Sequence, residues 1–165
     1  MSVAKYLEND AVISDCKKYR YLLRRTWDYK KPRALLIMLN PSTADATKDD
    51  ATIRSCVRLL SGLGYGSFEV VNLMAFRATK PKDLPTKPSE AMGAGNAGII
   101  DAAAGRCDVV ICAWGAHPYA SRFSGGAIDL ATLHKPAVYC FGKTKSGAPK
   151  HPLYIKSGTQ LETFP

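Results

Sequence analysis

An apolar run that stops abruptly at a polar loop constrains the fold of this chain most. Residues 34–39 read ALLIML and are followed at once by Asn40-Pro41-Ser42-Thr43. A run of about six apolar residues bounded by turn residues is typical of a strand buried in a parallel sheet. Pro41 cannot donate to a sheet ladder and favours an extended conformation at Asn40, so the strand is expected to end there.

Further apolar runs alternate with helical patterns along the chain. Strands are expected at residues 68–74, 108–114 and 137–141, helices at about 50–63 and 89–104, and a broken helical segment at 119–133. This alternation predicts a three-layer α/β sandwich with a central four-stranded, mostly parallel sheet. Residues 19–23 favour an additional N-terminal strand or hairpin, antiparallel or at an edge. The length of 165 residues fits one α/β domain, 1–165.

In open α/β sheets, ligands bind outside the carboxyl ends of the strands. Four segments of this chain follow expected strands and are therefore expected to carry the chemistry. These segments are Asn40 with its loop, residues 72–76, residues 114–117 and residues 142–151.

The net charge of +9, from 23 Lys and Arg against 14 Asp and Glu, suggests a polyanionic partner such as DNA or a nucleotide. A merely basic protein is the alternative. Lys143, Lys145 and Lys150 share one Gly-containing loop and are candidate phosphate contacts, or solvated side chains. Leu153 follows as an apolar residue suited either to wedge into a base stack or to anchor the loop.

Cysteine and hydropathy patterns exclude other classes. Five cysteines without a CxxC pair, together with three scattered histidines, argue against structural zinc, so no metal or cofactor is expected. Cys107, Cys112 and Cys140 read as small core residues. The odd cysteine count without a signal peptide suggests the cytoplasm. No apolar run approaches the roughly 20 residues that span a bilayer, so no membrane partner is expected.

Two asparagines lie at or beside the ends of apolar strands. The amide of Asn40 can orient a water or bind a polar substrate, or it can cap its own turn. Asn72 lies within the apolar run 68–74, where an unpaired buried amide costs about 1–3 kcal/mol. Its donors and acceptor match the edge of a pyrimidine. A hydrogen bond to a neighbouring loop is the alternative.

Further polar and aromatic residues occupy the same loops. Ser42 is a candidate substrate-binding residue, and Asp45 a candidate catalytic carboxylate that positions a water or balances a cationic transition state. Asp49 or Asp50 is expected to cap the following helix.

The loops after the last two expected strands carry an aromatic residue and two histidines. Trp114 either stacks on a base or packs in the core. His117 is a candidate donor or a solvated side chain. His151 can donate a hydrogen bond to a developing oxyanion.

Several motifs together resemble the domain-of-unknown-function family 1643 (DUF1643). They are MLNPSTADATKDDATIRSC, VVNLMAFRATKPKDL, WGAH and KHPLY, and the resemblance covers residues 19 to 155. The family name implies little about function.

A more distant resemblance is to the uracil-DNA glycosylase superfamily. Residues 38–42, MLNPS, are similar to its first motif, which reads Gly, an apolar residue, Asn-Pro-Gly in the mismatch-specific and single-strand-selective branches. Residues 71–73, VNL, resemble a strand ending in an Asn that reads the pyrimidine. Residues 151–153, HPL, resemble a His-Pro loop with a wedge residue. The chain departs from these patterns at Met38, Ser42 and Leu153, where Gly, Gly and Ser are usual.

This resemblance implies a uracil-DNA-glycosylase-like fold and an enzyme that hydrolyses the N-glycosidic bond of a base flipped into a pocket. Asn40 would orient the attacking water, Asn72 would hold the base edge, and His151 would stabilise charge leaving on the base. Two alternatives stay open. One is a non-catalytic nucleic-acid or nucleotide binder with the same cleft, and the other is an enzyme acting on free nucleotides or a small metabolite.

Overall fold

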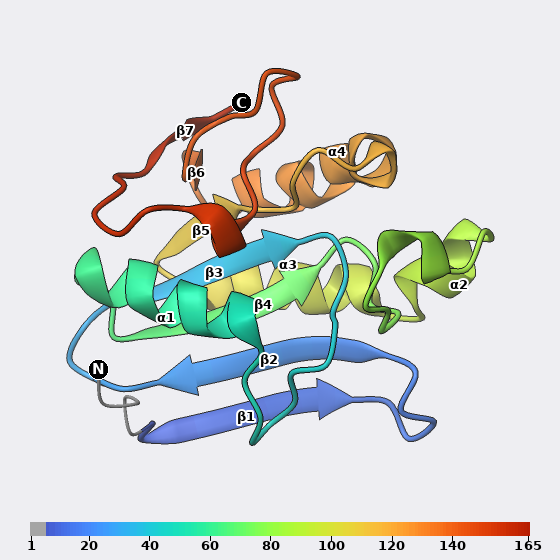
Figure 1. Cartoon of the computed structure of the whole chain (residues 1–165), viewed down its shortest axis with the longest axis horizontal. Helices are drawn as coiled ribbons and strands as arrows, with labels where there is room; N and C mark the ends of the chain where they lie inside the picture. The colour runs from blue at the N-terminus through green and yellow to red at the C-terminus, as the bar shows by residue number, and fades with distance from the viewer. Residues whose placement is uncertain (1–5) are drawn as a thin grey trace.

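A seven-stranded mixed sheet organises residues 6–165, the part of the chain that the computed structural model describes (Figure 1). The strands are β1 Glu8–Ile13, β2 Arg20–Thr26, β3 Arg33–Met38, β4 Ser67–Asn72, β5 Val109–Cys112, β6 Val138–Cys140 and β7 Glu162–Phe164. The α-helices are α1 Ala51–Gly62, α2 Pro88–Met92, α3 Asn96–Arg106 and α4 Pro118–Thr132. Two short 3-10 helices are η1 Pro81–Asp83 and η2 Pro152–Tyr154.

The sheet has the order β1-β2-β4-β3-β5-β6-β7. Strands β4, β3, β5 and β6 pair in parallel, as the sequence predicted for its central strands. The β1–β2 hairpin adds to β4 and the short β7 adds to β6, both antiparallel. The sheet is therefore larger than the expected four strands with an N-terminal hairpin, since β7 extends its other edge.

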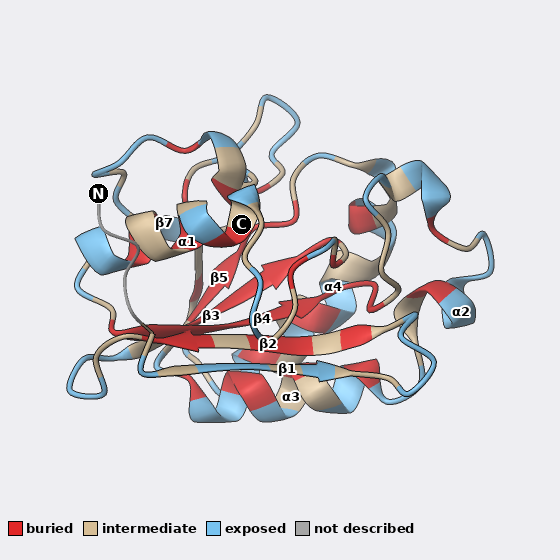
Figure 2. Cartoon of the chain, turned by 60° about the horizontal axis from the view of Figure 1, so that its bottom comes forward, coloured by how far each residue is buried: buried red, intermediate tan, exposed pale blue. Residues whose placement is uncertain are grey.

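Helices cover both faces of the parallel strands. Helix α1 and η2 lie on one face, and α3 and α4 lie on the other, with the buried centre of the sheet between them (Figures 1 and 2). Alternate residues of β3 supply the two cores: Leu36 and Met38 pack with α1, whereas Leu35 and Ile37 pack with α3 and α4. Because β3 is buried on both faces, its sequence is continuously apolar rather than alternating.

The helices differ from expectation at two places. The expected helix at residues 89–104 is interrupted, because Gly93 and Gly95 adopt positive φ angles of 83° and 78° between α2 and α3. The expected cap of the first helix is confirmed at Asp50, whose side chain accepts from the backbone N–H of Ile53 at 2.9 Å. Helix α4 is continuous rather than broken.

The connections out of the neighbouring strands β3 and β5 run to opposite faces of the sheet. The chain leaves β3 for α1 on one face of the sheet and leaves β5 for α4 on the other (Figure 1). Adjacent strands whose connections diverge in this way open a ligand-binding crevice at their carboxyl ends. The fold therefore directs the loops that carry Asn40 and His117 toward the same place.

Two further features bear on the expectations from composition. Cys107, Cys112 and Cys140 are buried, as predicted. Within residues 6–165, no helix combines the length and the apolar character that crossing a membrane requires.

Candidate functional site

A cavity of about 440 Å³ lies at the carboxyl ends of β3, β4 and β5. Seven of the site residues expected from the sequence line it together: Asn40, Ser42, Asn72, Trp114, His117, His151 and Leu153. The sequence missed several further lining residues, among them Arg20, Thr52 and Thr79, and it gave Asp50 only as a helix cap. This volume lies in the range of small-molecule sites, roughly 300–1,000 Å³.

Asn72 presents an unpaired amide to this cavity. It is the last residue of β4 and is only 1% exposed. Neither Nδ2 nor Oδ1 has a hydrogen-bond partner within residues 6–165. Such a side chain costs about 1–3 kcal/mol unless a ligand or solvent satisfies it. The alternative of a bond to a neighbouring loop is not seen, so Asn72 is free to read a group that both donates and accepts.

The two polar atoms of the Asn40 amide have different roles, since Nδ2 bonds to the protein and Oδ1 does not. Its Nδ2 donates to the carbonyls of Ala78 at 2.7 Å and Pro41 at 3.2 Å. Carbonyl oxygens only accept, so these two bonds fix which end of the amide is nitrogen. The Oδ1 atom accepts no bond within the described residues. This oxygen is therefore available to accept a hydrogen bond from a water molecule. The two hydrogen bonds that Nδ2 donates fix its position.

The two cavity histidines have the same local structure. In His117-Pro118-Tyr119 and His151-Pro152-Leu153, each Nδ1 accepts from the backbone N–H two residues on, at 3.1 Å and 3.2 Å. With Nδ1 as acceptor, the proton of the neutral ring lies on Nε2. Neither Nε2 makes a hydrogen bond within residues 6–165. Both rings are therefore free Nε2–H donors.

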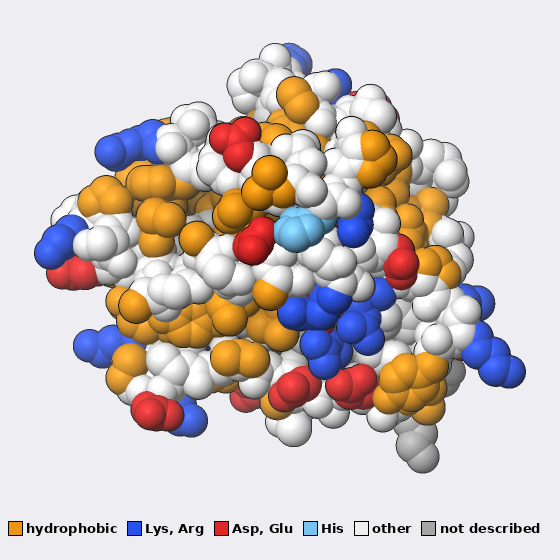
Figure 3. Space-filling model, turned by 180° about the vertical axis from the view of Figure 1, so that it is seen from behind, with side chains coloured by type: hydrophobic (Ala, Val, Ile, Leu, Met, Phe, Trp, Pro, Cys, Tyr) orange, Lys and Arg blue, Asp and Glu red, His pale blue; other side chains and the backbone are white. Residues whose placement is uncertain are grey.

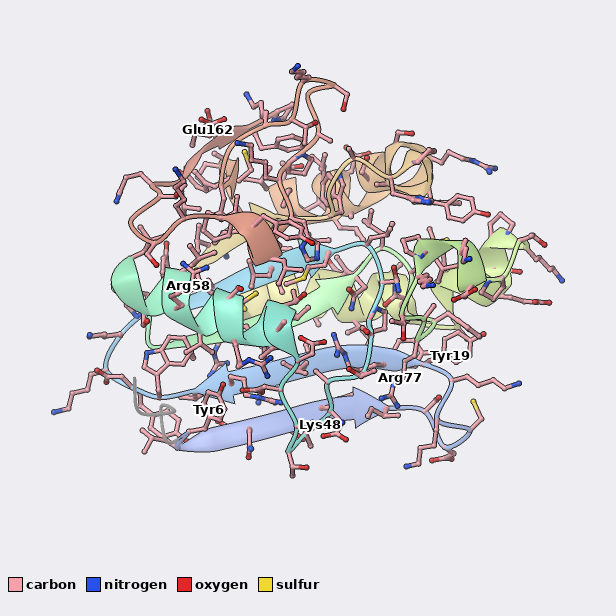
Figure 4. All side chains as sticks on the ribbon, in the orientation of Figure 1. Tyr6, Tyr19, Lys48, Arg58, Arg77 and Glu162 are labelled. Carbon is pink, nitrogen blue, oxygen red and sulfur yellow. The ribbon has the colours of Figure 1, made fainter. Side chains whose placement is uncertain are left out.

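His151 is kept neutral by its surroundings. Burial lowers its pKa below the usual value, and the charge of Asp50 only partly opposes this. Gly115, which lies beside His151 at the end of β5, has a positive φ of 77°, a conformation that glycine adopts without strain. Arg58 of α1 secures the segment that follows, since its guanidinium donates to the carbonyl of Ile155 at 2.9 Å and to Ser157 (Figure 4).

Trp114 and Leu153 each combine packing with a place on the cavity wall. Trp114 is buried and packs edge-to-face on Phe164, with ring centroids 5.6 Å apart. Trp114 is therefore a core residue that also lines the cavity. Leu153 is half-buried, and its neighbour Tyr154 on η2 is 86% exposed. Ser42 is half-buried beside Asn40.

Four expected site residues do not line the cavity. The carboxylate of Asp45 accepts from the backbone N–H groups of Thr47 at 2.9 Å and Lys48 at 2.8 Å, and these bonds lower its pKa. Asp45 thus shapes its own turn, whereas Asp50 reaches the cavity. The other three are Lys143, Lys145 and Lys150, which are exposed on a small hairpin that closes at the Lys143–Pro149 bridge.

A separate charged cluster lies on the α3 side of the sheet. The carboxylate of Glu69 is fully buried and contacts Arg24, Arg106 at 2.9 Å, and Arg33 at 3.7 Å. Figure 3 views this side of the molecule and shows Lys and Arg side chains gathered on it. Burial alone would raise the pKa of Glu69, but hydrogen bonds from Arg106 and Arg24 outweigh it and hold the pKa low. None of these four residues lines the cavity.

The described residues contain no group of three His, Cys, Asp or Glu side chains arranged to hold a metal ion. The cavity instead offers amides, imidazoles, one carboxylate and one guanidinium. These groups can bind a polar, planar ligand and orient a water molecule beside it.

The fold and the cavity define an α/β protein with a candidate ligand site where the connections out of β3 and β5 diverge. Residues 20–153 match the family described as "Protein of unknown function (DUF1643)", and the chain belongs to that family. No curated protein and no solved structure matches the chain.

Proposed function

We propose that this protein is a base-processing hydrolase that cleaves the N-glycosidic bond of a nucleotide whose base enters the cavity. The observation that carries the proposal is the unpaired, buried amide of Asn72. An amide offers a donor and an acceptor side by side, as does the edge of a pyrimidine base. Recognition by hydrogen bonds discriminates strongly, because a wrong ligand leaves the buried amide unpaired.

Asn40 and His151 supply the two functions that hydrolysis needs on either side of the bond. The free Oδ1 of Asn40 accepts a hydrogen bond from water and aims the water oxygen at C1′ of the sugar. The Nε2–H of His151 donates to the base as negative charge develops on it. A neutral imidazole suits this role, because its proton stays in place while it stabilises the leaving group.

The reaction is a hydrolysis. The water oxygen bonds to C1′, the C1′–N bond breaks, and its electron pair passes to the base. The water gives up one proton, the departing base gains one, and the sugar keeps the hydroxyl. Asp50 is the carboxylate on the cavity wall, so we assign to it the balancing of positive charge on the sugar and the uptake of the proton.

The resemblance to the uracil-DNA glycosylase superfamily supports the same roles. Its motif residues correspond to Asn40, Asn72 and His151, and these three line one cavity. In a polymer substrate the base must leave the stack to reach such a site. Leu153 and the exposed Tyr154 lie at the segment that would face the vacated position, and the Lys143–Lys150 hairpin would contact backbone phosphates.

The test is a base-release screen under single-turnover conditions. Oligonucleotides carrying uracil, mismatched or modified pyrimidines are incubated with excess protein, and free base is measured. On the substrate that reacts, Asn40→Ala should slow release by about 100-fold, the typical loss for one preorganised group. Thr43→Ala is the matched control, because Thr43 is exposed in the same loop and does not line the cavity.

Two results would contradict the proposal. Equal rates for Asn40→Ala and the wild type would remove the water-positioning role. Binding of DNA or nucleotides without release of any base from the screened set would favour the non-catalytic binder instead.

A further inference from the structure

Arg20 is a buried cation in the cavity without a paired carboxylate. It opens β2, is 3% exposed and lines the cavity. Its Nη1 donates to the carbonyl of Ala44 at 3.0 Å, but its Nε has no partner within residues 6–165. Nor does any carboxylate of these residues lie within 4.0 Å of its nitrogens.

Arg25 shows what a compensated arginine looks like in the same strand. Its side chain is also fully buried, but its Nε pairs with the carboxylate of Asp49 at 2.9 Å. An unpaired buried charge is costly, by several kcal/mol, and proteins pair almost all of them. The difference between Arg20 and Arg25 is that only Arg20 lines the cavity.

The charge of Arg20 persists at neutral pH. Burial lowers its pKa to about 10, with Asp50 opposing and Arg77 and Arg25 adding to the decrease. The guanidinium is therefore still a cation near pH 7. Asp50 is the carboxylate that stabilises this cation, but it lies beyond ion-pair distance and its Oδ1 accepts from the N–H of Ile53. The cavity consequently retains a guanidinium with a free donor.

Other donors surround the same space. His117 and His151 each have a free Nε2–H, and both line the cavity. Ala51 and Thr52 line it at the N-terminus of the 12-residue helix α1, where backbone N–H groups and the helix dipole favour anions. A guanidinium with several convergent N–H donors matches the oxygens of a phosphate group.

We propose that Arg20 binds a phosphate group inside the cavity, so that the ligand is a phosphorylated nucleoside with its base at Asn72. The base part of this inference rests on the proposed function, and the phosphate part goes beyond it. The phosphate is either the monoester of a free nucleotide or the diester of a nucleic-acid strand, and both present the same anionic oxygens. The cavity volume of about 440 Å³ accommodates a ligand of mononucleotide size.

The experiment compares ligands that differ only in the phosphate. Binding of inorganic phosphate, of deoxyuridine, deoxycytidine, thymidine, deoxyadenosine and deoxyguanosine, and of their 5′-monophosphates is measured by calorimetry. The proposal expects inorganic phosphate to bind and, if the ligand is a free nucleotide, at least one monophosphate to bind tenfold or more tightly than its nucleoside. Arg20→Gln should abolish that advantage and leave nucleoside binding in place.

Two control variants keep the result interpretable. Arg54→Gln removes a cation from the exposed side of α1, outside the cavity, and should preserve the full phosphate advantage. Arg20→Lys keeps a cation but loses the guanidinium fork, so the advantage should shrink but persist. If Arg20→Gln does not fold, Arg20→Lys decides, and an unchanged advantage in it would overturn the proposal.

Short single strands of the preferred base, with and without a 5′-phosphate, distinguish the two phosphate sources. Arg20 dependence confined to the strands identifies the diester, and dependence with the mononucleotide identifies the monoester. The proposal fails if no monophosphate or strand binds in an Arg20-dependent way. Base release without Arg20-dependent phosphate binding would support the proposed hydrolysis and contradict the phosphate site. Phosphate binding at Arg20 without base release would support the phosphate site and contradict the hydrolysis.

Discussion

The side-chain Nδ2 of Asn96 donates a 2.8 Å hydrogen bond to the main-chain carbonyl of Asn72. It also reaches the carbonyl of Leu73 at 3.3 Å. Asn96 is the first residue of α3 and is as buried as Asn72. The helix on one face of the sheet therefore fixes the end of β4, and with it the residue that opens toward the cavity. Asn96 uses its amide donor for structure, whereas Asn72 leaves its amide free.

This pair makes a prediction in which the same substitution has opposite effects. Asn72→Leu replaces an unpaired buried amide with an apolar group of similar size, so the free energy of unfolding should rise by about 1 kcal/mol or more. Asn96→Leu strips a donor from two carbonyls and should lower it by about 1–3 kcal/mol. Urea denaturation of both variants measures the difference. Equal destabilisation by the two substitutions would mean that Asn72 is already satisfied in the free protein.

Asn72→Leu should also abolish base recognition while it stabilises the fold. An amide kept at a cost to stability is expected where a ligand needs it. Calorimetric binding of the preferred nucleoside to this variant provides the measurement. Retained affinity in a stabilised Asn72→Leu protein would assign the base to another part of the cavity.

A second prediction concerns the pH dependence of stability. Burial lowers the pKa of His151 in the folded state, so the unfolded chain binds more protons between that value and about 6.5. Stability should therefore be highest above about pH 6.5 and should fall as the pH drops through this window. His151→Asn, which can still accept from the N–H of Leu153, should show a shallower fall. Urea midpoints between about pH 7.5 and pH 5 measure both proteins, and parallel curves would contradict the prediction.

A third prediction concerns the buried carboxylate of Glu69. Glu69→Gln leaves three guanidinium groups around a neutral side chain, and loss of one partner from a buried ion pair costs about 3–5 kcal/mol. Glu8→Gln is the control, because Glu8 contacts Arg24 at 3.2 Å from a partly exposed position, where a pair contributes about 1 kcal/mol or less. Thermal unfolding of both variants gives the comparison. If the Glu69→Gln protein is as stable as Glu8→Gln, the buried carboxylate of Glu69 contributes no more to stability than the partly exposed carboxylate of Glu8.

The parallel strands could be predicted from the sequence because burial on both faces makes them continuously apolar. Strand β1 reads ENDAVI and is largely exposed at an edge, and β7 has only three residues, so neither carries that pattern. These two strands form because they pair with β2 and β6, which their own composition does not reveal.

Some residues of the candidate site could likewise be predicted from the sequence, and others could not. Asn40, Asn72 and His151 could be placed together because each follows or ends an element that reaches one edge of the sheet. Arg20 could not, since an arginine in a basic stretch looks like a solvated residue until the tertiary fold buries it. The path of a loop is likewise not encoded locally, so the sequence could not show that the three hairpin lysines lie outside the cavity.

The last prediction concerns the salt dependence of DNA binding. Lys143, Lys145 and Lys150 are exposed on the hairpin that leads to His151, where they can contact backbone phosphates. Each phosphate contact contributes about 0.7–0.9 to the slope of log affinity against log salt concentration. Changing all three lysines to Gln should therefore flatten that slope by about 2–3 units and weaken binding at low salt.

The matched control removes the same number of positive charges from the other end of the parallel strands, where they begin. Lys30 and Lys31 precede β3, and Lys135 precedes β6, so all three lie where the parallel strands begin rather than where they end. Their replacement by Gln should leave the slope nearly unchanged, although the net charge falls from +9 by the same amount. Fluorescence anisotropy of a labelled oligonucleotide over a salt series measures both triple variants. Equal slopes in the two would mean that overall charge, and not the hairpin beside His151, attracts the DNA.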